Sequence, residues 1–234
     1  MLNVHKARDR GHANHGWLNS YHTFSFANYY DPRFMGHGNL RVINDDTVAP
    51  GRGFGTHPHR DMEIISYVLE GAMEHKDSMG NGSVIRPGDV QRMSAGTGVT
   101  HSEFNHSKSE PVHFLQIWVL PNASGHKPGY EQKFFSDEEK RGRLRLVASE
   151  TGRDGSVSLN QDVDLYAGLF DGAESAEFQV RPGRDFWIHV ARGTISVDGQ
   201  VLHAGDGGVV SGPGDLSFSN GQKAEVLLFD MAAR

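Results

Sequence analysis

The sequence predicts an all-β protein made of two tandem β-barrels with little helix. Short runs of β-branched and aromatic residues recur about every 8–12 residues and end at turn residues, a pattern typical of sandwiches and barrels. The 234 residues include 29 Gly and nine Pro without a repeating period, which favours many tight turns. The layout of the first half also returns in the second half, which indicates a duplication.

In the first half, each expected strand follows from a local pattern. Asn44-Asp45-Asp46 is expected to close one strand, and Gly80-Asn81-Gly82 predicts a hairpin with a type I′ turn, because Asn-Gly readily supplies two positive φ angles. Val112–Leu120 is the strongest apolar run. The expected strands are 22–26, 40–44, 57–59, 63–70, 72–77, 90–93, 101–103 and 112–120.

We expect an N-terminal domain at residues 1–125, a linker at 126–140 and a C-terminal domain at 141–234. Ser136-Asp137-Glu138-Glu139 has the form of a capping box and predicts one short helical turn before Gly142. Asp198-Gly199 predicts a two-residue hairpin. Tyr67–Met73 corresponds in layout to His189–Ile195, and Arg86–Asp89 corresponds to His203–Asp206.

Composition excludes several classes of protein. The net charge of −6, with one basic cluster at residues 140–145, argues against a nucleic-acid surface. The chain has no cysteine, so disulfides and thiolate metal ligands are excluded. The N-terminus lacks an apolar signal segment, and no apolar run reaches the ~18 residues of a membrane helix. We therefore expect a soluble, cytoplasmic protein without a membrane or nucleic-acid partner.

Histidine is the outlier in the composition, and twelve of the fourteen precede residue 130. Two pairs have ligand spacing: His57 with His59, and His101 with Glu103. On a strand, positions i and i+2 face the same side. If the two segments are neighbouring strands, the four side chains can meet one ion, since cross-strand Cβ atoms lie roughly 5 Å apart.

This donor set favours an open transition-metal site in the N-terminal domain, whereas an isolated strand histidine is more often structural. Three imidazoles and a carboxylate suit Fe(II), Mn(II), Co(II), Ni(II) or Cu(II). Four protein ligands on a six-coordinate ion leave two positions for water, substrate or O2. Pro58 cannot donate to a strand ladder, so its strand should be at a sheet edge or begin there. The second half carries no equivalent pairs.

The sequence resembles the cupins, and more narrowly the pirin family, including bacterial pirin-like proteins with quercetin 2,3-dioxygenase activity. Gly51-x5-His57-x-His59-x3-Glu63 resembles the first cupin motif, and Gly98-x2-His101-x3-Asn105 the second. The residues that match pirins are 10–12, 22–32, 54–59, 93–98 and 101–103. The likeness is strong through residue 120 and weaker after residue 140.

The resemblance implies a bicupin with iron, most simply Fe(II), held by His57, His59, His101 and Glu103. It implies that a flavonol and O2 meet at the metal and that the central ring opens with release of carbon monoxide. Many cupins use a carboxylate near Glu63 as ligand; here we expect Glu63 instead near the ion as a general base or as a surface charge. Glu103 is the expected ligand carboxylate.

Other residues near the predicted site keep two interpretations. Gln116 either orients a metal-bound water or is a plain amide at the edge of the core. Five aromatic residues either line a flavonol pocket or belong to the core; they are Phe24, Phe26, Phe54, Phe114 and Trp118.

Three functions compete. The first is a metal-dependent dioxygenase acting on quercetin-like flavonols. The second is a non-catalytic iron protein whose redox state tunes binding to a protein partner, as the pirin resemblance also suggests. The third, a cupin isomerase or metal-bound sugar enzyme, is disfavoured by the narrower resemblance to pirins.

Overall fold

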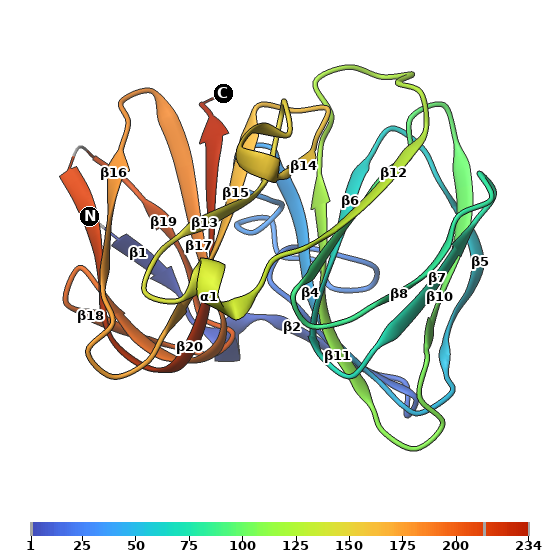
Figure 1. The fold of residues 1–234 in the computed structure, drawn as a ribbon, viewed down its shortest axis with the longest axis horizontal. Helices are drawn as coiled ribbons and strands as arrows, with labels where there is room; N and C mark the ends of the chain where they lie inside the picture. The colour runs from blue at the N-terminus through green and yellow to red at the C-terminus, as the bar shows by residue number, and fades with distance from the viewer. Residues whose placement is uncertain (1, 213, 234) are drawn as a thin grey trace.

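The computed structural model describes residues 2–212 and 214–233, which form two β-barrels side by side (Figure 1). The predicted all-β, two-barrel class is therefore confirmed. Helix is confined, within the described ranges, to the α-helix α1 (Asp137–Lys140) and the 3-10 helices η1 (Ala7–Asp9) and η2 (Arg153–Gly155). No helix in this part of the chain is long and apolar enough to span a membrane.

The first barrel consists of a seven-stranded and a four-stranded sheet. The larger sheet has the order β12-β9-β6-β11-β4-β3-β2 and the smaller one β5-β10-β7-β8. Their strands are β2 (Gly11–Asn14), β3 (Leu18–His22), β4 (Leu40–Val48), β5 (Gly53–His59), β6 (Glu63–Glu70), β7 (Met73–Asp77), β8 (Gly82–Ile85), β9 (Asp89–Ser94), β10 (Val99–Asn105), β11 (Val112–Val119) and β12 (Gly129–Phe134).

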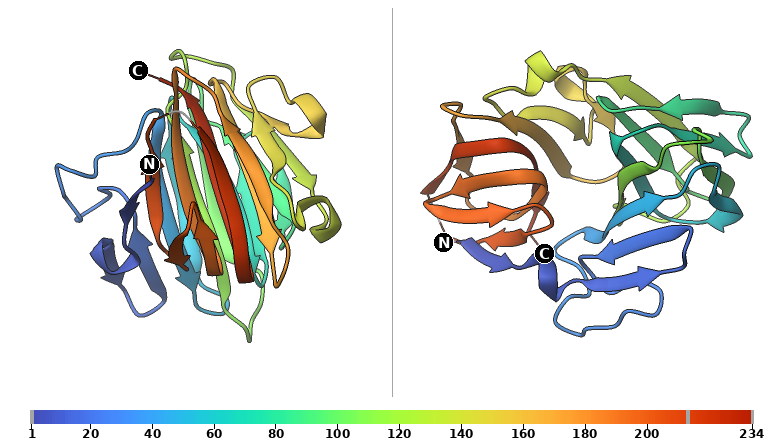
Figure 2. Two further views of the ribbon diagram at one scale, coloured as in Figure 1. Left: turned by 90° about the vertical axis from the view of Figure 1, so that its left-hand side faces the viewer. Right: turned by 90° about the horizontal axis from the view of Figure 1, so that it is seen from below.

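The second barrel is one curved sheet with the order β1-β19-β17-β20-β15-β13-β14, to which β16 and β18 add at β20 and β17. Its strands are β1 (Leu2–His5), β13 (Arg145–Ser149), β14 (Val157–Ser158), β15 (Val163–Phe170), β16 (Ala176–Val180), β17 (Arg184–Val197), β18 (Gln200–His203), β19 (Gly207–Val210) and β20 (Gly214–Ala232). The N-terminal segment passes along one side of both barrels (Figure 2).

The barrels pack through an apolar core that both contribute. This cluster combines Ile65 and Leu115 of the first barrel with Leu165 and Phe229 of the second, all fully buried. Polar contacts cross the same contact region: the Tyr67 hydroxyl donates to Glu225 over 2.6 Å. The two barrels therefore share one hydrophobic cluster at their contact, in addition to clusters inside each barrel.

The segment predicted as a linker is largely structured. β12 pairs with β9 of the first barrel over the whole of Gly129–Phe134. The capping box is confirmed, because the Ser136 side chain accepts from the Glu139 backbone while Glu139 caps the Ser136 N–H. At the other end of the chain, β1 pairs with β19 of the second barrel. The domain limits at residues 125 and 141 stay a prediction.

The two predicted hairpin turns have different outcomes. Asp198 (φ 48°) and Gly199 (φ 74°) form the expected two-residue loop between β17 and β18. The first turn is different from the prediction: Asp77 and Asn81 face each other, and the positive φ is at Gly80 (93°). A three-residue loop forms because the Asp77 carboxylate accepts the N–H groups of Met79 and Asn81.

Two strand limits were also wrong. The strand expected over residues 22–26 ends at His22, because Ser25 exchanges hydrogen bonds with the Asp31 backbone and draws the chain into a loop. The turn expected at Asn44-Asp45-Asp46 lies inside β4 instead. Its polar residues are accommodated in a strand because Asp45 is paired with Arg10 and His113 on one face, over 2.9 and 2.6 Å.

The internal duplication has a backbone counterpart at matching glycines. Gly71 and Gly193 occupy equivalent places in the two halves and have φ angles of 76° and 67°. A Cβ atom would lie 2.6 Å from the Pro111 carbonyl oxygen at the first position and 2.3 Å from the Gln222 carbonyl oxygen at the second. Both barrels thus need glycine where a strand turns against its neighbour.

Candidate metal centre

The predicted ligand strands are neighbours. β5 and β10 pair antiparallel, with His57 directly opposite His101, and β5 lies at the end of its sheet, as expected from Pro58. Between His101 and Glu103 the register shifts, because three steps along β5 oppose two along β10. Such a bulge turns side chains out of the regular alternation, and bulges are common next to active sites.

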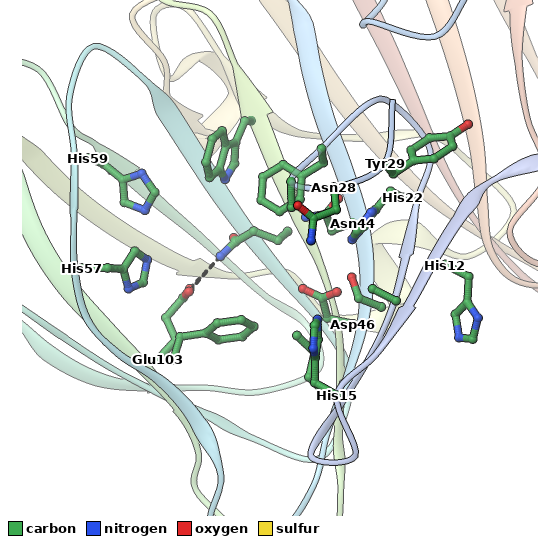
Figure 3. Close-up of a pocket in the computed structure, with 18 residues that line it drawn as sticks. His12, His15, His22, Asn28, Tyr29, Asn44, Asp46, His57, His59 and Glu103 are labelled. Atoms are coloured by element: carbon green, nitrogen blue, oxygen red, sulfur yellow. Dashed lines mark hydrogen bonds between the residues drawn. The ribbon is translucent and has the colours of Figure 1, made fainter. Parts of the chain in front are cut away.

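Three imidazoles converge at this bulge. The ring centres of His57, His59 and His101 lie 4.4–4.9 Å apart, and one nitrogen from each lies within 4.8 Å of the others. Figure 3 shows the rings of His57 and His59 pointing into the cavity from one strand. Three of the four predicted ligands therefore form a group that can hold a divalent ion.

The protonation states suit metal binding. Burial, with the neighbouring imidazoles, lowers the pKa of His59 to about 4 and that of His101 to about 3. Both rings are neutral at pH 7 and carry a free electron pair. His57 Nδ1 lies 2.8 Å from the Gly55 carbonyl oxygen, which fixes the tautomer and leaves Nε2 for an ion.

One buried atom tests whether a metal fits. His101 is 2% exposed, yet its Nε2 has no hydrogen-bond partner within residues 2–212 and 214–233. A buried ring nitrogen without a partner costs free energy unless another group engages it. A metal ion shared with His57 and His59 would satisfy this atom, so the residues fit the expected group.

Glu103 adjoins this group through His101. It forms a second set of ligand-type side chains with His101 and His75, whose oxygen and nitrogen atoms again lie within 4.8 Å of one another. Both Glu103 oxygens accept from Gln116 Nε2 over 2.9 Å, and Ser66 Oγ lies 3.4 Å from one of them. Gln116 therefore orients the carboxylate rather than only filling the core edge.

His75 is a functional candidate that the sequence analysis missed. It is fully buried on β7, with Nδ1 3.5 Å from His101 Nδ1 and Nε2 3.2 Å from Asp77. A histidine and a carboxylate behind a ligand imidazole fix its orientation. The signal was the i, i+2 spacing of His75 and Asp77, the same spacing as in the two recognised pairs.

Glu63 is placed elsewhere. It is 1% exposed, and its carboxylate accepts from Ser94 (2.8 Å) and from the side chain of Asn160 (3.0 Å) in the second barrel. It is absent from the cavity lining among the described residues. The expectation that Glu63 is a base near the ion or a surface charge is wrong. Its hydrogen bonds hold the carboxylate in the interface between the two barrels, away from the cavity.

A cavity of about 550 Å³ opens beside the imidazoles of His57 and His59. Of the five aromatic residues with two interpretations, Phe26, Phe54 and Trp118 line it, whereas Phe24 and Phe114 belong to the core. Phe26 packs edge-on against Trp118, with ring centres 5.4 Å apart. The volume and apolar walls suit a small aromatic molecule.

The opposite wall of the cavity is polar and contains a carboxyl group that the sequence analysis did not single out. Asp46 is 4% exposed and lines the cavity from β4. Burial, reinforced by the charges of Asp45 and Glu103, raises its pKa to about 7, although a hydrogen bond from Ser20 opposes the shift. The prediction of a turn here hid the fact that Asn44 and Asp46 share one strand face.

Two barrels, with a group of side chains that can hold a metal ion in the first, define the class of this protein as a bicupin. Residues 3–119 match the family model described as Pirin, and residues 146–231 match the one described as quercetinase C-terminal cupin domain. The chain belongs to the pirin family, as the resemblance predicted.

Relatives are similar over the whole chain. A protein of Escherichia coli named quercetin 2,3-dioxygenase is 48% identical over 231 residues, which cover 99% of both chains. A crystal structure of the bacterial pirin YhhW from Escherichia coli in complex with nickel(II) superposes with a TM-score of 0.94 at 47% identity, covering all of both chains. The prediction that the chain is an enzyme is thus confirmed.

A more distant structure matches in fold alone. A quercetin 2,3-dioxygenase from Acinetobacter baumannii has a TM-score of 0.78 at 22% identity, over 99% of this chain and 86% of its own. The two-barrel arrangement therefore persists at low sequence identity.

Proposed function

We propose that this protein is a metal-dependent dioxygenase that opens the central ring of quercetin-like flavonols with O2 and releases carbon monoxide. The observation that carries the proposal is the meeting of three imidazoles, two of which line a cavity that is also walled by Phe26, Phe54 and Trp118. The full-length similarity to a relative named quercetin 2,3-dioxygenase supports the substrate class.

We propose His57, His59, His101 and Glu103 as the metal ligands, and Fe(II) as the ion, with Ni(II), Co(II), Mn(II) and Cu(II) as alternatives. The nickel complex of a relative 47% identical to this chain supports a divalent ion. A bound ion of this kind supplies Lewis acidity toward a coordinated hydroxyl and redox capacity toward O2.

The protein residues supply binding, orientation and a place for protons. Phe26 and Trp118 would pack against a flat ring system, and the apolar walls would exclude water. We assign the flavonol proton to Glu103, whose carboxylate Gln116 holds beside His101. Glu63 has no part in this step, since its oxygens are occupied by Ser94 and Asn160.

The test is anaerobic loading with Fe(II) or Ni(II), followed by quercetin and air. We expect loss of the flavonol absorbance and one carbon monoxide per quercetin consumed. His57→Ala should retain at least tenfold less metal and show no turnover above background. His106→Ala, which alters an exposed histidine outside the cavity, should behave as the wild type.

Two results would contradict the proposal. Full turnover by His57→Ala would move the site elsewhere. Stoichiometric metal in the wild type without any loss of quercetin would favour the non-catalytic iron protein with a protein partner. The cytoplasmic location stays a prediction that cell fractionation can check.

A further inference from the structure

A group of buried polar side chains lines the cavity wall across from the imidazoles. His22, Asn44 and Asp46 line it, and each is only 4% exposed. Each also has one polar atom without a hydrogen-bond partner in the part of the chain that the structure describes: Nδ1 of His22, Oδ1 of Asn44 and Oδ1 of Asp46. Figure 3 shows the three side chains gathered on the cavity side of β3 and β4.

Strand register explains why they share this wall. His22 is directly opposite Asn44, and Ser20 is directly opposite Asp46, in the pairing of β3 with β4. Positions i and i+2 of each strand face one side, so all four side chains turn toward the cavity. Asp45, on the other face of β4, is instead fully engaged by Arg10 and His113.

The line of polar side chains on β3 and β4 continues toward the candidate metal ligands. Asn44 is opposite Gln116 in the pairing of β4 with β11, and Gln116 in turn donates to Glu103. A ligand held beside the imidazoles therefore extends along a line of polar groups. Phe26 and Trp118, which pack edge to face against each other, give this line an aromatic wall that suits a flat ring system.

The unpartnered atoms specify what the ligand must offer. Oδ1 of Asn44 is an acceptor, and the Asp46 carboxyl, whose pKa is about 7, accepts when ionised and can donate when protonated, so both suit hydroxyl groups of the ligand. Burial lowers the pKa of His22, so its ring is neutral and can either donate or accept. Polar groups left unpaired in a closed site penalise any ligand that lacks the matching donors.

We propose that His22, Asn44 and Asp46 form a subsite for the hydroxyl groups on the pendant phenyl ring of a flavonol whose fused rings lie beside the imidazoles. This inference rests on the proposed function and deepens it by naming the substrate feature that the cavity selects. Quercetin, which carries two hydroxyls on that ring, should be preferred over galangin, which carries none there.

The experiment measures anaerobic dissociation constants of quercetin and galangin on metal-loaded protein by calorimetry. For the wild type we expect galangin to bind at least tenfold more weakly. Asp46→Leu should bring the ratio close to one, since both carboxyl oxygens are removed while the branched shape is kept. Gln91→Leu is the matched control: it removes another buried, unpartnered acceptor that lies outside the cavity lining of the described chain.

The outcomes distinguish a failure of the proposed subsite from a failure of the proposed reaction. A ratio near one in the wild type overturns the subsite even if quercetin is cleaved, and so does an unchanged ratio in folded Asp46→Leu. A collapsed ratio supports it even if no turnover occurs, in which case only the proposed function fails. Should Asp46→Leu not fold, Asp46→Asn replaces it; a threefold fall in the ratio supports the subsite and no change overturns it.

Discussion

Gln116 uses one amide nitrogen to hold both oxygens of Glu103, and its own carbonyl oxygen accepts from Ser66 over 3.1 Å. These contacts fix a carboxylate that is 3% exposed. Residues that hydrogen-bond a metal ligand set its orientation. Mutating such a residue therefore commonly lowers the affinity for the metal by as much as tens of fold.

Gln116→Leu should therefore weaken metal binding about 10- to 100-fold. Competition with a chelator measures the affinity directly, without reference to turnover. Gln222→Leu, an exposed glutamine of the second barrel, is the matched control and should leave the affinity unchanged. Equal affinities in the two variants would show that Gln116 does not position Glu103.

The Asp46 carboxyl should make the stability of the metal-free protein depend on pH. Its pKa is about 7 when folded and 3.8 in an exposed chain, so the folded state holds the extra proton between these values. Its contribution to stability is complete below pH 3.8 and is lost as the pH rises through 7. Above pH 7, burial of the ionised carboxylate lowers the free energy of unfolding by at most about 4 kcal/mol.

Asp46→Asn should consequently be more stable than the wild type at pH 8, with the advantage shrinking toward pH 5. Urea unfolding of metal-free protein at both pH values checks this. A stability difference that is the same at pH 5 and pH 8 would contradict it.

At this scale, the positions of side chains could be predicted where the residues are close along the chain. The His-x-His and His-x-Glu pairs needed only the two-residue period of a strand to place them on one side. Glu63 failed because its partner Asn160 is 97 positions away, in the other barrel. Contacts of that kind depend on the packing of the whole chain.

At the scale of the strand, the bulge in β5 depends on a close approach at Gly53. A Cβ atom there would lie 2.2 Å from the Glu103 carbonyl oxygen and 2.5 Å from Phe104 Cα. At Gly55, two residues along, a Cβ atom would meet nothing within 4 Å among the residues that the structure covers.

Gly53→Ala should push β5 away from β10 and separate His57 from His101. We expect at least a tenfold loss of metal affinity, together with a lower melting temperature. Gly55→Ala should keep both near the wild-type values, which makes the pair a matched test by chelator competition and thermal melting. If the two variants lose affinity equally, the close approach at Gly53 is not what holds the ligands together.

Strand identity was predicted better than strand limits. Continuous β-branched, aromatic and apolar runs correctly marked the strands Glu63–Glu70 and Val112–Val119, because both faces of these strands are largely buried. Asn44-Asp45-Asp46 reads locally as a turn, and it is a strand only because Arg10 and His113 neutralise the middle residue. Pairing between residues far apart in the sequence therefore overrides the local turn propensity here.

For the whole molecule, the shared core predicts that the two barrels unfold together. Tyr67 and Glu225 form a buried contact across it, and burial beside that carboxylate raises the pKa of Tyr67 well above its usual value, so the hydroxyl remains a donor. Removing the donor leaves a buried carboxylate with one partner fewer.

Tyr67→Phe should lower the free energy of unfolding by about 1–3 kcal/mol. Urea unfolding followed by Trp118 and Trp187 fluorescence, in single-tryptophan variants, should give coincident transitions, one tryptophan reporting on each barrel. Tyr30→Phe, on a residue 72% exposed, should change stability by less than about 0.5 kcal/mol. Two separated transitions would mean that the barrels are independent.

The clasp between β1 and β19 has a consequence during synthesis. Leu2 pairs with Val210, and Lys6 and the Ala7 backbone both bind Asp206, so β1 cannot form its native pairing until a strand some 200 residues later has been synthesised. At roughly 5–20 residues per second, that delay is on the order of 10–40 s. Throughout this interval β1 has no native neighbour, so we expect β1 to be the segment that most needs protection by a chaperone.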